Sequence, residues 1–370
     1  MSWLPPPHSW ARFFFLLLSK TLDTLFFTTR WRSLWPSVLG DLPRVPYPTY
    51  PDMTFYAEVP GGIWEFLRTP NTTLSCLTSV LNMTVTLPLL VLLLFKINSF
   101  YEPMMSNYGR ILAEKSHGKE WVAKNPEKIQ KFGEYSYRLA YHTFVSLYAV
   151  VAFRDMPWFH DTREMWTNYF THPVTVGLTW YTLLQCSYNI QQLVKIGLMS
   201  FERRRAWPYV GRSPLRRGDF REMFLHHVVT NALVLSSSYF RITRSGTMVM
   251  ILHDLSDIPV DLSKLANFLK WKRATAACFA VMLGFWIFFR LYYFPAQIIW
   301  SVHVEATVLM EQGMPDDVYF LYNRAFVLGL STLAILHWVW FVIIARIGML
   351  LLFKGEAHDL SEHKKGEKQN

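Results

Sequence analysis

Seven apolar stretches constrain the fold of this 370-residue chain more than any other feature of its sequence. Each is near the roughly 20 residues that a helix needs to cross the hydrocarbon of a bilayer. The composition agrees, because only 17% of the residues are charged, against about 25% in ordinary soluble domains. The predicted fold is all-α, a polytopic membrane helical bundle of about seven transmembrane helices. The stretches lie at about 75–97, 136–153, 174–199, 222–240, 246–268, 274–300 and 325–353.

Three of these stretches would make poor lipid-facing helices. The second, fourth and fifth, 136–153, 222–240 and 246–268, are short or rich in polar residues. Polar side chains at membrane depth are tolerated mainly where they face the interior of a bundle. We therefore expect these three helices to sit inside the bundle.

The positive charge of the chain, +10 in total, is concentrated in a few connecting segments. The segment 201–222 has seven arginines against three acidic residues, whereas 298–323 has four acidic residues and no Lys or Arg. Under the positive-inside rule the basic segments and the C-terminus face the cytosol, and 298–323 faces the lumen. No nucleic-acid-binding motif is visible. We therefore interpret the arginines as topology signals and contacts for membrane lipids, and we expect no nucleic-acid partner.

Four regions are expected along the chain. Residues 1–73 form an N-terminal interfacial or lumenal region, in which the apolar segment 12–28 is an interfacial helix, an uncleaved signal-like segment or an eighth span. Residues 74–130 hold the first transmembrane helix and a compact cytosolic linker. Residues 131–353 form the main membrane domain. Residues 354–370, charged and without aromatic side chains, form a disordered cytosolic tail.

Two neighbouring stretches carry ionisable residues at membrane depth: His226 and His227 in the fourth, and His253, Asp254 and Asp257 in the fifth. Such groups cost roughly 2.5–3.5 kcal/mol each on insertion scales unless they are paired or hydrated, so they indicate an internal polar site. An Asp beside a His in a dry cavity is the minimal arrangement that activates a base or a nucleophile. These two stretches therefore predict an internal polar site that could activate a base or a nucleophile.

Two other interpretations of this cluster are weaker. A single buried histidine is most often a satisfied core residue, but three histidines and two aspartates on adjacent spans are harder to explain that way. Membrane di-iron hydroxylases need many histidines, and this chain has one His-His pair with one further histidine nearby. We therefore expect no metal site.

The run 216–271 resembles the Lag1p motif of ceramide synthases. It contains Asp219-Phe220, the segment Met223 to His227, a serine-rich end of the fourth stretch, and His253-Asp254 with Asp257. Further matching features in the run are Arg244 with Gly246, and Lys264 with Ala266-Asn267. Features upstream also match, namely Lys131-Phe132, Glu134, Arg138, Trp158, Trp166, Asn168-Tyr169, Tyr181 and Ser187.

This resemblance implies a TLC domain over 131–353 and a multi-pass enzyme of the endoplasmic reticulum membrane. Carried over by position, it implies that His226, His227, Asp254 and Asp257 are the catalytic residues. Ceramide synthases transfer a fatty acyl group from acyl-CoA to the amine of a sphingoid long-chain base, giving (dihydro)ceramide and CoA. The segment 98–135 is too short for the homeobox-like domain of many animal members. The chain is therefore more similar to fungal, plant or protist forms, and a homodimer or a small regulatory membrane subunit is an expected partner.

The implied chemistry suits the residues. A thioester is already activated, so no metal or redox cofactor is expected. An imidazole can accept the acyl group as an acyl-imidazole, or it can deprotonate the amine for direct attack. The basic segment before the fourth stretch suits the phosphates of CoA, or it acts as a topology signal alone. The predicted substrate-binding residues are Arg216, Arg217, Arg244, His253, Asn231 and Ser237.

Two alternative functions remain open. One is a non-enzymatic TLC protein that senses or chaperones lipid. The other is a different membrane lipid acyltransferase that uses the same residues. The complete set of two histidines and two aspartates favours an enzyme.

The charge-based topology also predicts where the chain is glycosylated. Asn71-Thr72-Thr73 is a sequon on the lumenal side, whereas Asn82-Met83-Thr84 lies inside the first stretch, where a transferase cannot reach it. In a host that modifies the protein, endoglycosidase should shift the wild-type band and leave an Asn71→Gln variant unshifted. A shift that persists in the variant would overturn the span boundaries or the orientation.

Overall fold

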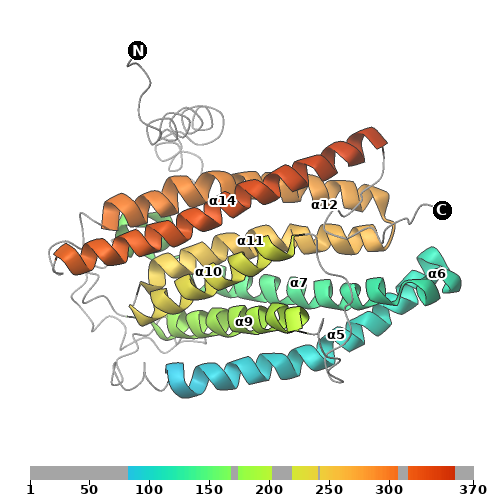
Figure 1. Cartoon of the computed structure of the whole chain (residues 1–370), viewed down its shortest axis with the longest axis horizontal. Helices are drawn as coiled ribbons and strands as arrows, with labels where there is room; N and C mark the ends of the chain where they lie inside the picture. The colour runs from blue at the N-terminus through green and yellow to red at the C-terminus, as the bar shows by residue number, and fades with distance from the viewer. Residues whose placement is uncertain (1–81, 168–173, 202–218, 241, 307–315, 355–370) are drawn as a thin grey trace, which may run out of the picture. The chain divides into compact units, whose positions relative to one another are not determined.

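The apolar stretches fold as α-helices, which satisfy every backbone polar group internally, as a bilayer requires. The computed structural model describes residues 82–167, 174–201, 219–240, 242–306 and 316–354. The long helices, shown in Figure 1, are α5 Leu87–His117 (preceded by the π-helical turn η2 Asn82–Thr86), α7 Pro126–Phe153, α9 Val176–Phe201, α10 Phe220–Tyr239, α11 Thr243–Phe268, α12 Lys272–Phe285 (continued by η4 Trp286–Ile299 and η5 Ser301–Glu305) and α14 Asp316–Lys354. The short ones are α6 Lys119–Lys124, α8 Pro157–His160 and η3 Thr162–Met165.

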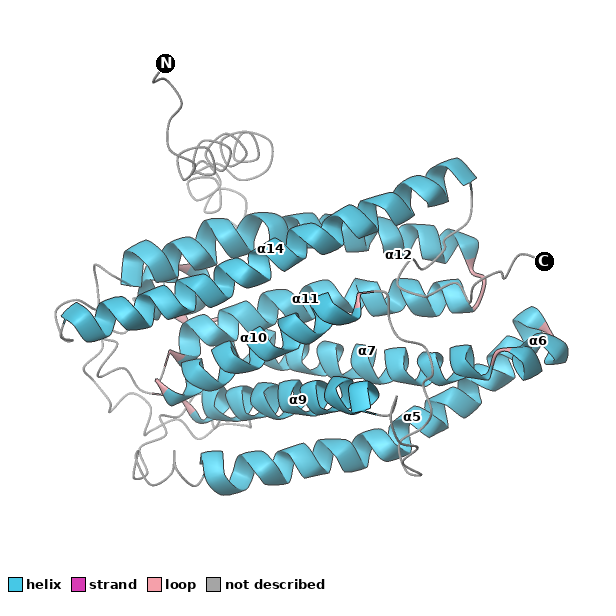
Figure 2. Cartoon of the chain, in the orientation of Figure 1, coloured by secondary structure: helices cyan, strands magenta, loops and turns pink. Residues whose placement is uncertain are grey.

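The all-α membrane bundle predicted from the sequence is confirmed. Figure 2 shows helices joined by short loops, with no strand among the described residues. Three helices are long and apolar enough to cross a membrane, Thr84–His117, Lys272–Glu305 and Asn323–Met349. The other long helices are more polar, and their crossing of the membrane stays a prediction.

Helix α11 forms the centre of the bundle. Sixteen of its 26 residues are buried, and it packs against α7, α9, α10, α12 and η4. Its polar side chains therefore face other helices, as expected for the fifth stretch. The same prediction is wrong for the fourth stretch. Only four of the 20 residues of α10 are buried, and Phe224, Leu225 and Val228 are exposed, because this helix has an apolar outer face that suits lipid.

The segment 98–135, which covers the predicted compact linker, consists of the end of α5, of α6 and of the start of α7, and its cytosolic position stays a prediction. Helix α5 continues past residue 97 to His117, where Gly118 adopts a positive φ of 89° and its N–H caps the Glu114 carbonyl. Glycine adopts a positive φ without the steric cost that other residues pay, so it can end the helix here. After α6, α7 begins at Pro126, whose missing N–H is tolerated at the first helical position. The segment is therefore a continuous helical hairpin, with no room for an inserted domain.

Several predicted features lie outside the described residues. These are the region 1–73 with the segment 12–28, the sequon at Asn71, the part of the basic segment at 202–218, and the tail at 355–370. The described residues all belong to one unit, 60–370.

Glycine permits the close approach of α5 and α7. A Cβ atom added at Gly133 would lie 2.4 Å from the backbone oxygen of Glu102 and 2.3 Å from Ser106 Oγ. Backbone atoms cannot give way as a flexible side chain can, so only glycine allows this packing. Small residues let membrane helices approach closely, and the contact is then made by backbone packing.

This packing predicts that Gly133→Ala lowers the Tm of the purified protein, because α5 must move away from α7. Gly197→Ala is the matched control, since a Cβ atom there has nothing within 4 Å. Alanine is favoured over glycine in a helix by roughly 0.5–1 kcal/mol, so Gly197→Ala should keep or raise the Tm. Thermal unfolding in detergent provides the measurement. Equal effects of the two substitutions would contradict the close-packing argument.

Candidate active site

A cavity of about 350 Å³ lies among α7, α10, α11, α12 and α14. At one end it is lined by His226 from α10, Asp257 from α11 and Trp340 from α14. Arg290 from η4 lines the same end. Residues that are far apart in sequence therefore meet around one cavity, as is typical of a small-molecule site.

His226 is the member of the histidine pair that lines this cavity. Its ring centroid lies 5.4 Å from that of His227, 5.3 Å from that of Trp340 and 6.4 Å from that of His253. Its Nδ1 atom is buried without a hydrogen-bond partner among the described residues. The two histidines face different directions, because adjacent helical residues point about 100° apart.

Asp257 is neutralised by a buried arginine. Arg290 donates to its Oδ1 atom at 2.6 Å. Arg290 also donates to Ser256 Oγ at 2.6 Å and to the His253 carbonyl at 3.1 Å, and its guanidinium stacks over the Trp286 ring. These contacts hold a positive charge beside the cavity, although η4 is otherwise apolar.

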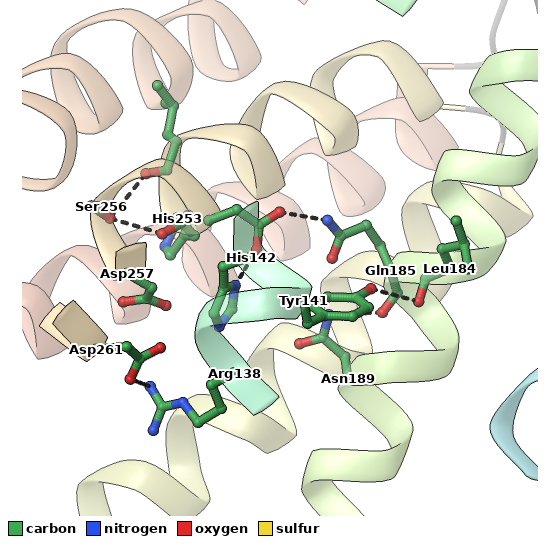
Figure 3. A network of polar contacts seen from close by, with 12 residues as sticks. Arg138, Tyr141, His142, Leu184, Gln185, Asn189, His253, Ser256, Asp257 and Asp261 are labelled. Atoms are coloured by element: carbon green, nitrogen blue, oxygen red, sulfur yellow. Dashed lines mark hydrogen bonds and ion pairs between the residues drawn. The ribbon is translucent and has the colours of Figure 1, made fainter. Parts of the chain in front are cut away.

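Asp254 has different partners, although it lies only three residues from Asp257. His142 Nδ1 of α7 lies 2.9 Å from its Oδ1, while Gln185 Nε2 of α9 donates to its Oδ2 at 2.5 Å. The Tyr181 hydroxyl donates to the same Oδ2 at 3.3 Å. Asp254 therefore joins α11 to α7 and α9. Figure 3 shows His142 of α7 and Gln185 of α9 on either side of this network, beside His253 of α11. The sequence predicted an Asp beside the histidine pair, whereas the histidine that contacts Asp254 is His142.

His253 and His337 form a buried pair of imidazoles. His253 Nδ1 lies 2.6 Å from the Val249 carbonyl, so this nitrogen carries a hydrogen. In the neutral ring, Nε2 of His253 then carries no hydrogen and can only accept. His337 Nε2, which lies 3.1 Å away, must therefore donate to it. The Val249 carbonyl thereby sets the tautomer of His253, and His253 in turn sets that of His337. The His253 ring is also close to His226.

The other predicted substrate-binding residues lie elsewhere. Asn231 donates to the carbonyls of Asn189 and His227, and Arg244 donates to the Glu164 carbonyl. Ser237 lines a separate cavity of about 30 Å³ that is mostly apolar. A substrate-binding role for these three stays a prediction, and Arg216 and Arg217 fall outside the described residues.

The sequence did not lead us to predict three residues that lie in or beside this site, namely His142, Arg290 and His337. A signal was present for each, because an ionisable residue inside a predicted membrane span is by default a candidate functional residue. Arg290 is the one charged residue in the apolar stretch 274–300, and His337 shares the stretch 325–353 with Arg346 alone. Within the described part of the chain, no three His, Cys, Asp or Glu side chains are grouped to hold a metal, and the expected absence of a cofactor stays a prediction.

The Asp254–His142 contact predicts a stability difference between buried and exposed pairs. His142→Leu should lower the Tm strongly, because it leaves a buried carboxylate short of a donor, at a cost of about 1–3 kcal/mol or more. The control is Arg163→Ala, which removes a largely exposed pair with Asp161 and should change the Tm little. Equal Tm changes in the two variants would show that the buried contact does not stabilise the bundle.

Comparison with known proteins identifies the family. The TLC domain (TRAM, LAG1 and CLN8) matches residues 131–346. Ceramide synthase hyl-1 of Caenorhabditis elegans is 29% identical over 63% of this chain and 61% of its own length. Ceramide synthase 5 of Homo sapiens is 28% identical over 62% of this chain and 53% of its own length. Ceramide synthase LOH1 of Arabidopsis thaliana is 25% identical over 65% of this chain and 74% of its own length. The aligned part thus spans just over half to about three quarters of these relatives. The match over more than half of the chain shows that it belongs to the TLC domain family.

Proposed function

We propose that this protein is a ceramide synthase of the endoplasmic reticulum membrane, with its C-terminus in the cytosol. It transfers a fatty acyl group from acyl-CoA to the amine of a sphingoid base. The observation that carries the proposal is His226, an imidazole that lines a cavity inside a membrane bundle, beside a buried arginine and two further buried imidazoles. The names of the relatives support the same reaction.

In the first step, the unprotonated nitrogen of His226 attacks the thioester carbonyl carbon. A carbon–nitrogen bond forms and the carbon–sulfur bond breaks, giving an acyl-imidazole. The thiolate of CoA takes up the proton that the imidazolium gives up. An imidazole is a suitable nucleophile here, because its acyl derivative remains reactive toward an amine.

In the second step, the amine of the sphingoid base attacks the acyl carbon. The amide bond forms, the bond to His226 breaks, and the imidazole takes up the proton that the amine loses. The product is ceramide, and the protein returns to its starting state. A dry cavity favours both steps, because water would otherwise hydrolyse the acyl-imidazole.

Arg290 is assigned to stabilise the negative charge that develops on the carbonyl oxygen. Its guanidinium lines the cavity and is held in place by Asp257 and Ser256. A preorganised cation beside a developing oxyanion is worth more in a water-excluded site than in water. Asp257 then acts by orienting Arg290, and His337 acts by donating a hydrogen bond to Nε2 of His253.

The two-step reaction predicts a covalent intermediate. Incubation of the purified protein with acyl-CoA alone should release CoA and increase the mass of the peptide containing His226 by one acyl group. His226→Ala should form no adduct and lose about 10²-fold or more of its ceramide synthesis, as expected when a group that attacks or transfers protons is removed. His227→Ala is the matched control, and it should still form the adduct.

Each other outcome contradicts a different part of the proposal. Full activity with sphinganine and no trapped adduct would establish direct attack by the amine, with His226 as general base. An adduct on His227 would keep the chemistry and correct the residue. Binding of lipid without CoA release from any acyl-CoA would point to a non-enzymatic member of the family.

A further inference from the structure

The end of the cavity away from His226 is lined by three lysines. Lys128 and Lys131 come from the first turns of α7, and Lys264 comes from the last two turns of α11. Lys128 and Lys131 are three residues apart and share a helix face. The Lys264 ammonium lies 4.8 Å from the centre of the Tyr135 ring, and Tyr135 also lines the cavity.

Aromatic side chains form the wall beside these lysines. His117 and Trp121 stack with ring centroids 3.9 Å apart and an interplanar angle of 18°. His117 Nε2 lies 2.6 Å from the Phe268 carbonyl, which ties the end of α5 to the end of α11. Lys128 lies over the Trp121 ring at 5.8 Å. His117, Trp121 and Phe268 all line the cavity.

The charges at this end favour an anionic ligand with more than one negative group. The lysines are accompanied by one lining carboxylate, Asp219, and Lys264 also lies near Asp261 behind the lining, so lysines still outnumber acidic residues at this end. The two arginines further in are paired, Arg290 with Asp257 at 2.6 Å and Arg138 with Asp261 at 3.5 Å. Charge-assisted contacts from lysine are a common way to bind phosphate.

The lysine end and the histidine end are separated along the helices. Asp257 and Lys264 are seven residues apart on α11, as are Asp219 and His226 on α10, which corresponds to about 10 Å along each helix. A ligand that reaches both ends is therefore elongated, with its negative charges at one end and its reactive group at the other.

We propose that Lys128, Lys131 and Lys264 bind the phosphates of the nucleotide part of a CoA thioester, with the His117–Trp121 stack as the wall beside its adenine. This inference rests on the proposed function. It assigns to helices α7 and α11 a role that the sequence had given to Arg216 and Arg217. The pantetheine arm then runs along the cavity and brings the thioester to His226.

The test replaces the three lysines together, in the full-length protein reconstituted into nanodiscs of neutral lipid. The variant is Lys128→Gln/Lys131→Gln/Lys264→Gln. The matched control is Lys119→Gln/Lys124→Gln/Lys272→Gln, which removes the same charge from exposed lysines at the same end of the bundle that do not line the cavity. The probes are free CoA and adenosine 3′,5′-bisphosphate, titrated by calorimetry, so that binding is measured without turnover.

The cavity variant should bind both probes about tenfold more weakly or worse, because hydrogen bonds to charged groups are lost. The control should bind them as the wild type does. In turnover assays the KM for acyl-CoA should rise in the cavity variant, while the KM for sphinganine stays the same. If the cavity variant binds CoA as tightly as the wild type, the proposal is overturned. Circular dichroism and Tm of the variant establish that a loss of binding does not reflect unfolding.

Anionic lipid headgroups carry the same phosphate chemistry, and a second arm separates the two sources. The wild type and the variant are each also reconstituted into nanodiscs that contain phosphatidylserine or phosphatidylinositol phosphate. The binding of these lipids to each protein is then compared with the binding of CoA. Loss of lipid binding with CoA binding intact would assign the lysines to the membrane and overturn the proposal. Lysine-dependent CoA binding without any acyl transfer would keep this site and reject the proposed function.

Discussion

The structure depends on one stripe of carboxylates along the central helix α11. Asp254, Asp257 and Asp261 follow one another at intervals of three and four residues, so they lie on one face. Each is paired with a residue from a neighbouring helix, His142 and Arg138 of α7 and Arg290 of η4. A buried charge without a partner costs several kcal/mol, so α11 can occupy the centre of the bundle only where these partners surround it. The stripe thus sets the rotation and the axial position of α11.

That rotation determines what the neighbouring positions of α11 face. With Asp254 turned toward α7 and α9, the preceding residue His253 faces His337 of α14 and the ring of His226. Asp257 and Arg290 then line the cavity beside His226. The pairing of Asp257 with Arg290 therefore also places a cation in the cavity that His226 lines. Asp257 therefore contributes both to the stability of the bundle and to the proposed reaction.

The two ends of the cavity suit the two parts of the proposed substrate. The histidine end is inside the bundle and bordered by apolar and aromatic side chains such as Trp286 and Trp340, whereas the lysine end lies where α5, α7 and α11 begin or end. An acyl chain favours the first surroundings, and a nucleotide bearing phosphates favours the second. The continuation of α5 to His117 matters for this arrangement, because it carries the aromatic wall to the lysines. A flexible linker at 98–135 would not have done so.

The sequence by itself determined the helices and pointed to two that carry candidate site residues, α10 and α11. Apolar length and the cost of burying an ionisable group are local properties, so His226, His253, Asp254 and Asp257 could be found without a structure. The outer position of α10 could be recognised only from the tertiary packing. The continuation of α5 past residue 97 could be recognised only from the structure, which ends this helix at Gly118. The partners of the carboxylates also could not be predicted from the sequence. His142 lies 112 residues from Asp254, Arg290 lies 33 from Asp257, and His337 lies 84 from His253. Only the tertiary structure decides such pairs, because the free energy of each pair depends on which helix faces are buried against each other.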